Sequence, residues 1–157
     1  WNYDGEWSVD DGVISVQDSD NGGTLKEGHD WENYFFSFEF RIVNRWAGWI
    51  IRAAKQDHFA MLQFGHNEVN PHIRYPEPLP GGGLWSKQSI PHSALLREWN
   101  RAITEVKEDA IKVWINGTLV WSDPQWLSEL PTGTVGFRCV NNEHAKFRNI
   151  SVVAFRL

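Results

Sequence analysis

Two stretches with a period of two constrain the fold more than any other feature of this sequence. Between Tyr34 and Val43 apolar residues alternate with polar ones, and between Trp49 and Phe64 two alternating runs flank the polar segment at 55–58. A period of two is that of a β-strand, in which successive side chains point to opposite faces. The first stretch predicts a strand with one buried and one wetter face, as in an antiparallel sheet. The second predicts two strands joined by a turn.

Turn signals recur along the rest of the chain at intervals of roughly 8–12 residues, and almost no helix signal separates them. Asn116-Gly117, between the alternating runs at 111–115 and 119–121, is the strongest two-residue hairpin turn. We count about ten to twelve strands. The 157 residues suit one domain with a substantial core. The sequence therefore predicts an all-β fold: a single antiparallel two-sheet β-sandwich over residues 1–157.

Composition excludes several classes of function. The formal net charge is −5 and no basic run reaches five residues, so neither nucleic acid nor an anionic membrane is an expected partner. No apolar stretch approaches the ~18 residues of a membrane span. Cys139 is the only cysteine, which excludes an intrachain disulfide and predicts a buried apolar filler. The chain opens on WNYDGEW without a signal peptide, so we expect an excised module, and the compartment, extracellular or cell-surface among others, stays open.

Catalytic motifs are weak. Glu105 and Asp109 flank a predicted hairpin turn with Lys107 between them, which is typical of a solvated tip rather than of a catalytic carboxylate pair. The sequence contains no Gly-x-Ser-x-Gly and no His-x-x-x-His, and its three successive glycines at 81–83 are not followed by a helix signal. An enzyme is therefore less favoured than a binding module.

Long polar side chains on otherwise apolar strands are the strongest functional signal. They are Arg52, Gln63, Arg74 and Arg138. Each buried guanidinium needs acceptors, because an unpaired one costs several kcal/mol. Two interpretations stay open: structural pairing with Asp57, Glu39 or Glu143, or a concave floor that hydrogen-bonds the hydroxyls of a sugar. Further candidates for such a site are Asp57, His58, His72, Asn141 and Asn142.

Ten tryptophans are unusual in a chain of this length. Part of them must form core, but exposed aromatic rings also stack on the flat faces of sugars. Trp46 and Trp85 are the candidates by their position near predicted loops. Trp85 follows the segment Pro76–Gly83, whose prolines and glycines predict an irregular connection.

Several motifs together resemble a known family. They are Gly-x-x-x-Arg-Ala at Gly48–Ala53, Asp-x-Phe-x-Met-x-Gln-Phe at Asp57–Phe64, Pro-His-Ile-Arg at Pro71–Arg74, and the later segments Trp99–Arg101, Val113–Gly117 and Gly133–Arg138. From about Val13 to Phe155 the chain resembles concanavalin-A-like β-sandwich modules, and most closely the family 67 carbohydrate-binding modules of bacterial α-L-rhamnosidases. The resemblance implies a jelly roll, also shared by laminin-G-like domains.

That family binds L-rhamnose with a calcium ion at an Asp-Asn pair on the central hairpin. The matching pair here is Asp57-His58, so the resemblance implies Ca²⁺ as cofactor with Asp57 as its ligand, although imidazole in place of Asn departs from the pattern. The leading interpretation is a non-catalytic carbohydrate-binding module that targets further domains of a parent polypeptide. The alternatives are a glycoside or keto-sugar hydrolase of the same fold, and a laminin-G-like protein-interaction domain.

Overall fold

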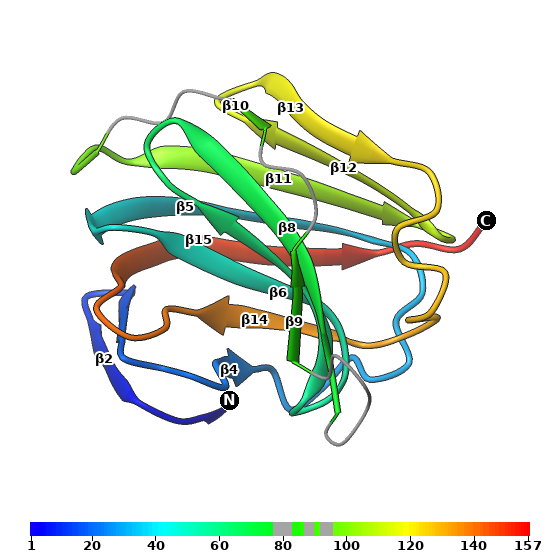
Figure 1. The fold of residues 1–157 in the computed structure, drawn as a ribbon, viewed down its shortest axis with the longest axis horizontal. Coiled ribbons are helices and arrows are strands. Elements are labelled where there is room, and N and C mark those ends of the chain that lie inside the picture. Colours follow the sequence, from blue (N-terminus) through cyan, green and yellow to red (C-terminus); the bar gives the residue numbers. More distant parts are fainter. Residues whose placement is uncertain (77–82, 87–89, 92–95) are drawn as a thin grey trace.

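The structure is a computed structural model that describes residues 1–76, 83–86, 90–91 and 96–157, of which 83–86 and 90 are described by their backbone alone. These residues form two antiparallel sheets packed face to face, and no helix occurs among them (Figure 1). The all-β sandwich expected from the alternation is confirmed. The expected irregular connection at 76–83 lies almost wholly outside the described residues.

One sheet has eight strands. In Figure 1 its strand β8 crosses in front of β15, which belongs to the other sheet. The central strands pair in the order β14, β6, β7, β8, and short strands extend both edges. Its members are β1 (Asn2–Tyr3), β4 (Gly23–Thr24), β14 (Thr134–Arg138), β6 (Ala47–Lys55), β7 (His58–Phe64), β8 (Glu68–Tyr75), β10 (Ile90–Pro91) and β9 (Gly83–Ser86).

The other sheet has seven strands, in the order β13, β12, β11, β5, β15, β3, β2. The hairpin turn at Asn116-Gly117 joins β12 to β13 as predicted, with a positive φ at both residues. The bounds are β13 (Thr118–Asp123), β12 (Ala110–Ile115), β11 (Asn100–Lys107), β5 (Tyr34–Asn44), β15 (His144–Ala154), β3 (Val13–Gln17) and β2 (Glu6–Asp10).

The main core lies between the sheets and is rich in aromatic rings. Phe36, Phe38 and Phe40 of β5 point inward, as their alternation predicts, and are at most 1% exposed. Trp49 stacks on Phe64 with ring centroids 4.1 Å apart. Cys139 is buried in the same cluster, which confirms the prediction of an apolar filler. The inward faces are thus occupied, and a ligand can meet the sheets on their outer faces or edges.

The alternation of β6 breaks at Arg52. The pairing of β6 with β7 shifts register between Ile51 and Lys55, and Arg52 has a φ of +52°, in the left-handed region. Ala53 takes the outer-face position that Arg52 would otherwise hold, and packs with Ile50 and Phe59. A bulge re-aims the side chain at this point, so the period of two assigns Arg52 to the wrong face.

A second, smaller apolar cluster lies on the outer face of the eight-stranded sheet. It consists of Ile50, Ala53, Phe59 and Met61, all buried. The loop 18–22 between β3 and β4 covers it in part: a Cβ built at Gly22 would lie 2.6 Å from the Ile50 side chain. With a φ of +77°, Gly22 also adopts a backbone conformation that other residues rarely adopt.

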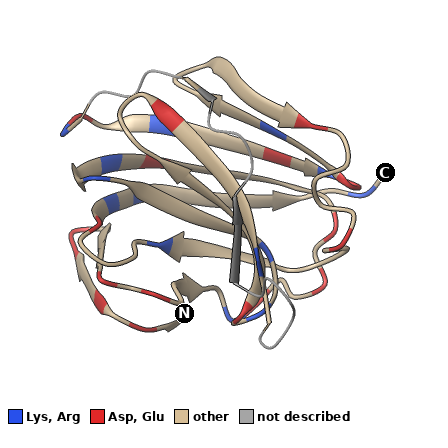
Figure 2. Cartoon of the chain, viewed as in Figure 1, with Lys and Arg blue, Asp and Glu red and all other residues tan. Residues whose placement is uncertain are grey.

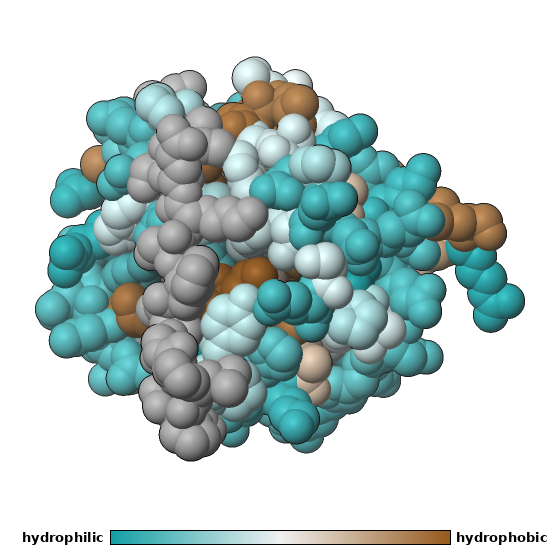
Figure 3. Space-filling model, turned by 45° about the vertical axis from the view of Figure 1, so that its right-hand side comes forward, coloured by the Kyte–Doolittle hydropathy of each residue, from teal (hydrophilic) through white to brown (hydrophobic). Residues whose placement is uncertain are grey.

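Charged side chains of both signs are mixed over the surface of the described part of the chain (Figure 2). Lys and Arg are interspersed with Asp and Glu over both sheets (Figure 2). Hydrophilic side chains dominate the face shown in Figure 3, with a small apolar group beside the grey atoms. Among the described residues, no helix is long and apolar enough to cross a bilayer.

Candidate functional site

Four of the predicted residues meet on the outer face of the eight-stranded sheet. They come from β7, β8 and β14, and we call them the outer-face cluster: Gln63, His72, Arg74 and Arg138. In the ladder, Gln63 and Arg138 flank Gly48 of β6, while Arg74 pairs with Phe59, four positions from Gln63 along β7. The strand register thus gathers residues that are up to 75 positions apart in the chain.

The two arginines lie against one another over the same ring. Arg138 Cζ lies 5.8 Å and Arg74 Cζ 5.9 Å from the Phe59 ring centroid. The carbonyl oxygen of Asp20 accepts hydrogen bonds from both, at 2.6 Å from Arg138 Nε and 3.3 Å from Arg74 Nη1. Arg138 is 5% exposed, and its burial, followed by the charge of Arg74, lowers its pKa to about 10.

His72 is buried beside this pair, with 2% of its surface exposed. Its Nδ1 donates to the carbonyl oxygen of Asn70 at 3.0 Å, because that oxygen can only accept. Nε2 is then the unprotonated nitrogen, and it is buried without a hydrogen-bond partner among the described residues. Burial, and to a lesser extent the charge of Arg138, lower the pKa of His72 to about 4. The ring is therefore neutral at pH 7 and offers one free acceptor.

Gln63 is anchored by Glu143, which lies in the loop before β15. Gln63 Nε2 donates to Glu143 Oε1, and Glu143 Oε2 accepts from the Val140 backbone nitrogen at 2.8 Å. Glu143 is 4% exposed, and this burial raises its pKa. Both of its oxygens are thus engaged within the protein. This pair fixes the amide of Gln63 beside the arginines.

The loop 18–22 completes the site and is held by Asp4. The Asp4 carboxylate accepts from Ser19 Oγ at 2.9 Å, from the Asn21 backbone nitrogen at 3.1 Å and from Asn21 Nδ2 at 2.8 Å. Asn21 Oδ1 in turn accepts from Arg74 Nη1 at 2.9 Å. Asp20 and Asn21 are absent from the predicted site. The paired glycines at 22–23 were the available signal of a loop pressed against a sheet.

Arg52 does not join the outer-face cluster. Its side chain, 1% exposed, is held at the end of the sandwich by backbone carbonyl oxygens. They belong to Glu32, Glu108 at 2.7 Å, Leu130 and Pro131. These contacts match the structural alternative of pairing with acceptors, although the acceptors are carbonyls and not the carboxylates that were expected. A role of Arg52 in ligand binding stays a prediction.

The remaining predicted residues are dispersed. Asp57 and His58 lie half-buried at the β6–β7 turn, where His58 packs on Tyr75 with ring centroids 5.7 Å apart. Asn141 and Asn142 are exposed in the turn before β15. Trp46 lines a cavity of about 340 Å³ with His66 and Glu68. The side chain of Trp85 lies outside the described residues.

Calcium is not matched by the donors at the β6–β7 turn. Ca²⁺ takes roughly six to eight oxygen ligands, with carboxylates prominent among them. In the described part of the chain, no group of three or more His, Cys, Asp or Glu side chains is placed to hold a metal ion. Asp57 is thus a single carboxylate without further acidic side chains grouped around it among the described residues. Calcium binding by Asp57 stays a prediction that a chelator titration can test.

One cavity lies at the end of the sandwich, and no residue of the outer-face cluster lines it. Its volume is about 660 Å³, and Arg52 forms part of its wall together with Trp31, Asn33 and Asp109. A further cavity, of about 490 Å³, is lined by Trp7, Ser15 and His144, and Ser15 Oγ lies 2.8 Å from His144 Nε2. Neither cavity is lined by a residue of the outer-face cluster.

The fold and the polar outer face define a β-sandwich of the carbohydrate-binding or glycoside-hydrolase-like type. A sequence model of the 3-keto-alpha-glucoside-1,2-lyase-like domain matches residues 1–153. The chain belongs to this family. None of the curated proteins matches it by sequence.

Solved structures share this fold at low sequence identity. Carbohydrate-binding module CBM66 from Bacillus subtilis is 17% identical, with a TM-score of 0.65 over 96% of this chain and 92% of the other. A Parabacteroides distasonis protein provisionally named a glycosyl hydrolase is 17% identical, with a TM-score of 0.71 over 95% and 90%. A functionally unknown protein from Saccharomyces cerevisiae is 14% identical, with a TM-score of 0.67 over 100% and 96%.

These findings support a carbohydrate-type sandwich and not the family 67 modules specifically. The expected links to L-rhamnose and calcium came from that narrower resemblance and have no support here. The shared motifs, such as the Asn-Gly hairpin and the Gly-Phe-Arg strand, occur in several related sandwich families, and this is why they pointed to too narrow a group.

Proposed function

We propose that this chain binds a carbohydrate on the outer face of the eight-stranded sheet, through the outer-face cluster. One observation carries the proposal: rigid strands hold two guanidinium groups, an amide and an unpartnered imidazole nitrogen side by side. Sugar hydroxyls both donate and accept, so they can satisfy the arginine donors and the His72 acceptor together. Family membership and the carbohydrate-binding neighbour in the fold comparison support the same ligand class.

A glycan array followed by calorimetry tests this proposal. We expect at least one sugar to bind, and Arg74→Gln to weaken its binding by roughly tenfold, as the loss of charge-assisted hydrogen bonds implies. Arg101→Gln is the matched control, because Arg101 is an exposed arginine on β11 of the opposite sheet. Equal losses in both variants, or no sugar bound by the wild-type chain, would refute the proposal.

A second candidate is a lyase that acts on a 3-keto sugar, and His72 is the observation that favours it. A base could remove the proton at C2, which the ketone at C3 acidifies, while the guanidinium groups stabilise the enolate oxygen. The C1–O bond would then break, a C1–C2 double bond would form, and the leaving oxygen would take up a proton. The unprotonated Nε2 of His72 would take the C2 proton, and because that atom is buried, substrate binding would have to expose it.

The low basicity of His72 makes the lyase the weaker candidate and carbohydrate binding the stronger one. A pKa near 4 in place of 6.5 weakens the base by roughly 3 kcal/mol, whereas efficient general bases titrate near the working pH. Formation of an unsaturated product from a 3-keto-glucoside, lost in His72→Gln and kept in His66→Gln, would favour the lyase. Binding of that substrate without any product would leave carbohydrate binding alone.

A further inference from the structure

Among the described residues, no carboxylate forms an ion pair with either arginine of the outer-face cluster. The ion pairs between described residues are Lys112–Glu105 and Arg148–Glu39. The charges of Glu143, Asp20 and Asp4 act on Arg138 from a distance. Glu143 accepts from Gln63 and from the Val140 backbone, and Asp4 accepts from Ser19 and Asn21. Asp20 offers the arginines its carbonyl oxygen. The two cations therefore share one neutral carbonyl oxygen, and Arg74 has the neutral amide oxygen of Asn21 in addition.

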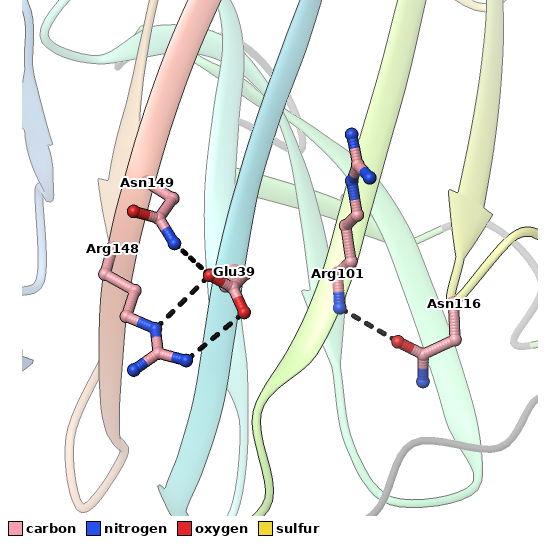
Figure 4. Close-up of polar contacts among 5 residues, drawn as sticks. All are labelled: Glu39, Arg101, Asn116, Arg148 and Asn149. Atoms are coloured by element: carbon pink, nitrogen blue, oxygen red, sulfur yellow. Dashed lines mark hydrogen bonds and ion pairs between the residues drawn. The ribbon is translucent and has the colours of Figure 1, made fainter.

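Arg148, on the outer face of the opposite sheet, shows what a satisfied arginine looks like in this protein. Its Nε and Nη2 donate to the two Glu39 carboxylate oxygens, each at 3.3 Å, and Asn149 Nδ2 donates to the same carboxylate (Figure 4). Its guanidinium also lies 3.9 Å from the centroid of the Trp99 ring. Arg74 and Arg138 have a ring beneath them but no such carboxylate.

Unused donors and one unused acceptor lie together in the cluster. Among the described residues, Nη2 of Arg138 and both Nε and Nη2 of Arg74 have no acceptor, and Nη1 of Arg138 points at the weak acceptor Met61 Sδ at 3.2 Å. His72 Nε2 lacks a donor. A simple anion would satisfy only the arginines, whereas an anion next to a hydroxyl would satisfy the imidazole as well.

From this arrangement we infer that the sugar bound here is an acidic one, with an anionic group held between Arg74 and Arg138 and a hydroxyl donating to His72 Nε2. The inference rests on the proposed carbohydrate binding and names its ligand class. The anionic group is the carboxylate of a sugar acid or a sulfate ester, since both present oxygens to a guanidinium pair.

Matched pairs of methyl glycosides isolate the charge. We would titrate the chain by calorimetry with the methyl glucosides, galactosides and mannosides, with the corresponding methyl uronides, and with the 6-sulfates. At least one acidic member should bind about tenfold or more tightly than its neutral partner, as a charge-assisted hydrogen bond implies. This preference should shrink as sodium chloride rises from ~50 to ~500 mM. The uronide and sulfate arms identify which anion is used.

Arg74→Gln should abolish the preference for the acidic member, and Arg101→Gln should preserve it. Because Arg74 is only half-buried, its variant should fold, and circular dichroism checks this; Arg138→Gln provides a second test. A folded Arg74→Gln chain that keeps the preference would overturn the inference.

The other outcomes separate the inference from the proposed function. If neutral sugars bind as tightly as every acidic partner, the acidic ligand is wrong and carbohydrate binding stands. If no sugar binds, neutral or acidic, on the array or in calorimetry, both are wrong. If sodium sulfate alone binds as tightly as the acidic sugars, the face is a simple anion site and the inference fails.

Discussion

Arginines that look alike in the sequence have opposite settings in the folded chain. Arg52 and Arg138 each interrupt an apolar strand, and both are buried. Four backbone carbonyl oxygens surround the guanidinium of Arg52, whereas Arg138 has one carbonyl and a thioether. The alternation predicts the outer-face position of Arg138 but not the bulge at Arg52, because register depends on the partner strand and not on the strand itself.

Replacement of Arg52 should therefore act on stability. We expect Arg52→Ala to lower the free energy of unfolding by roughly 3–5 kcal/mol, because it leaves buried carbonyls without donors. Urea denaturation measures this, and Arg148→Ala, which removes a partly exposed ion pair, should cost about 1 kcal/mol or less. A stable Arg52→Ala chain that no longer binds sugar would instead make Arg52 a ligand residue.

His72 should make the stability of the chain dependent on pH in the acid range. Its pKa is about 4 in the folded chain and 6.5 in the unfolded chain, so between these values the unfolded state binds more protons. Stability is then fully present above pH ~6.5 and falls as the pH drops towards 4, by up to roughly 3 kcal/mol. Urea denaturation from pH 7 to 4 should show this loss, and His72→Gln should lack it. Parallel curves for both chains would contradict the buried neutral state of His72.

At the scale of elements, the site depends on a loop that the sequence does not mark as functional. Strand periodicity brings Gln63, His72 and Arg74 to one face, and this much was predictable from β7 and β8. The loop 18–22 lies between β3 and β4. Only its Asp-rich composition, and Gly22 followed by Gly23 of β4, hint at a special role. The placement of this loop depends on hydrogen bonds from Ser19 and Asn21 to Asp4. No sequence pattern links Asp4 to the loop, and the contact is visible only in the folded chain.

Asp4 should thus control the site without touching a ligand. Asp4→Ala removes the acceptor of three hydrogen bonds from Ser19 and Asn21, and the loop then holds Asp20 and its carbonyl oxygen less firmly. We expect sugar affinity to fall by several-fold to tenfold and stability by about 1–2 kcal/mol. Asp10→Ala, an exposed acid on β2, is the control. Unchanged affinity in Asp4→Ala would show that the loop has no part in binding.

At the scale of the whole molecule, the sandwich leaves two broad outer faces, and the two differ in how their charges are satisfied. The fold class was predictable because alternation, turns and the absence of helix signal all agree. The family was predicted only in part: a keto-sugar hydrolase of the same fold was among the alternatives, whereas the leading resemblance, to the family 67 modules, is not supported specifically. The class of ligand could not be predicted from the sequence, because it depends on which hydrogen-bond donors remain unpaired after folding.

The central claim is that the outer face of the eight-stranded sheet binds a sugar, and NMR chemical-shift mapping tests it most directly. The isotope-labelled chain would be titrated with the tightest sugar from the glycan array. The account predicts that the largest shifts arise at Gln63, His72, Arg74 and Arg138, with smaller ones in the loop 18–22. Shifts centred on Trp31 and Asn33 at the end cavity, or on the Arg148 face of the opposite sheet, would contradict it.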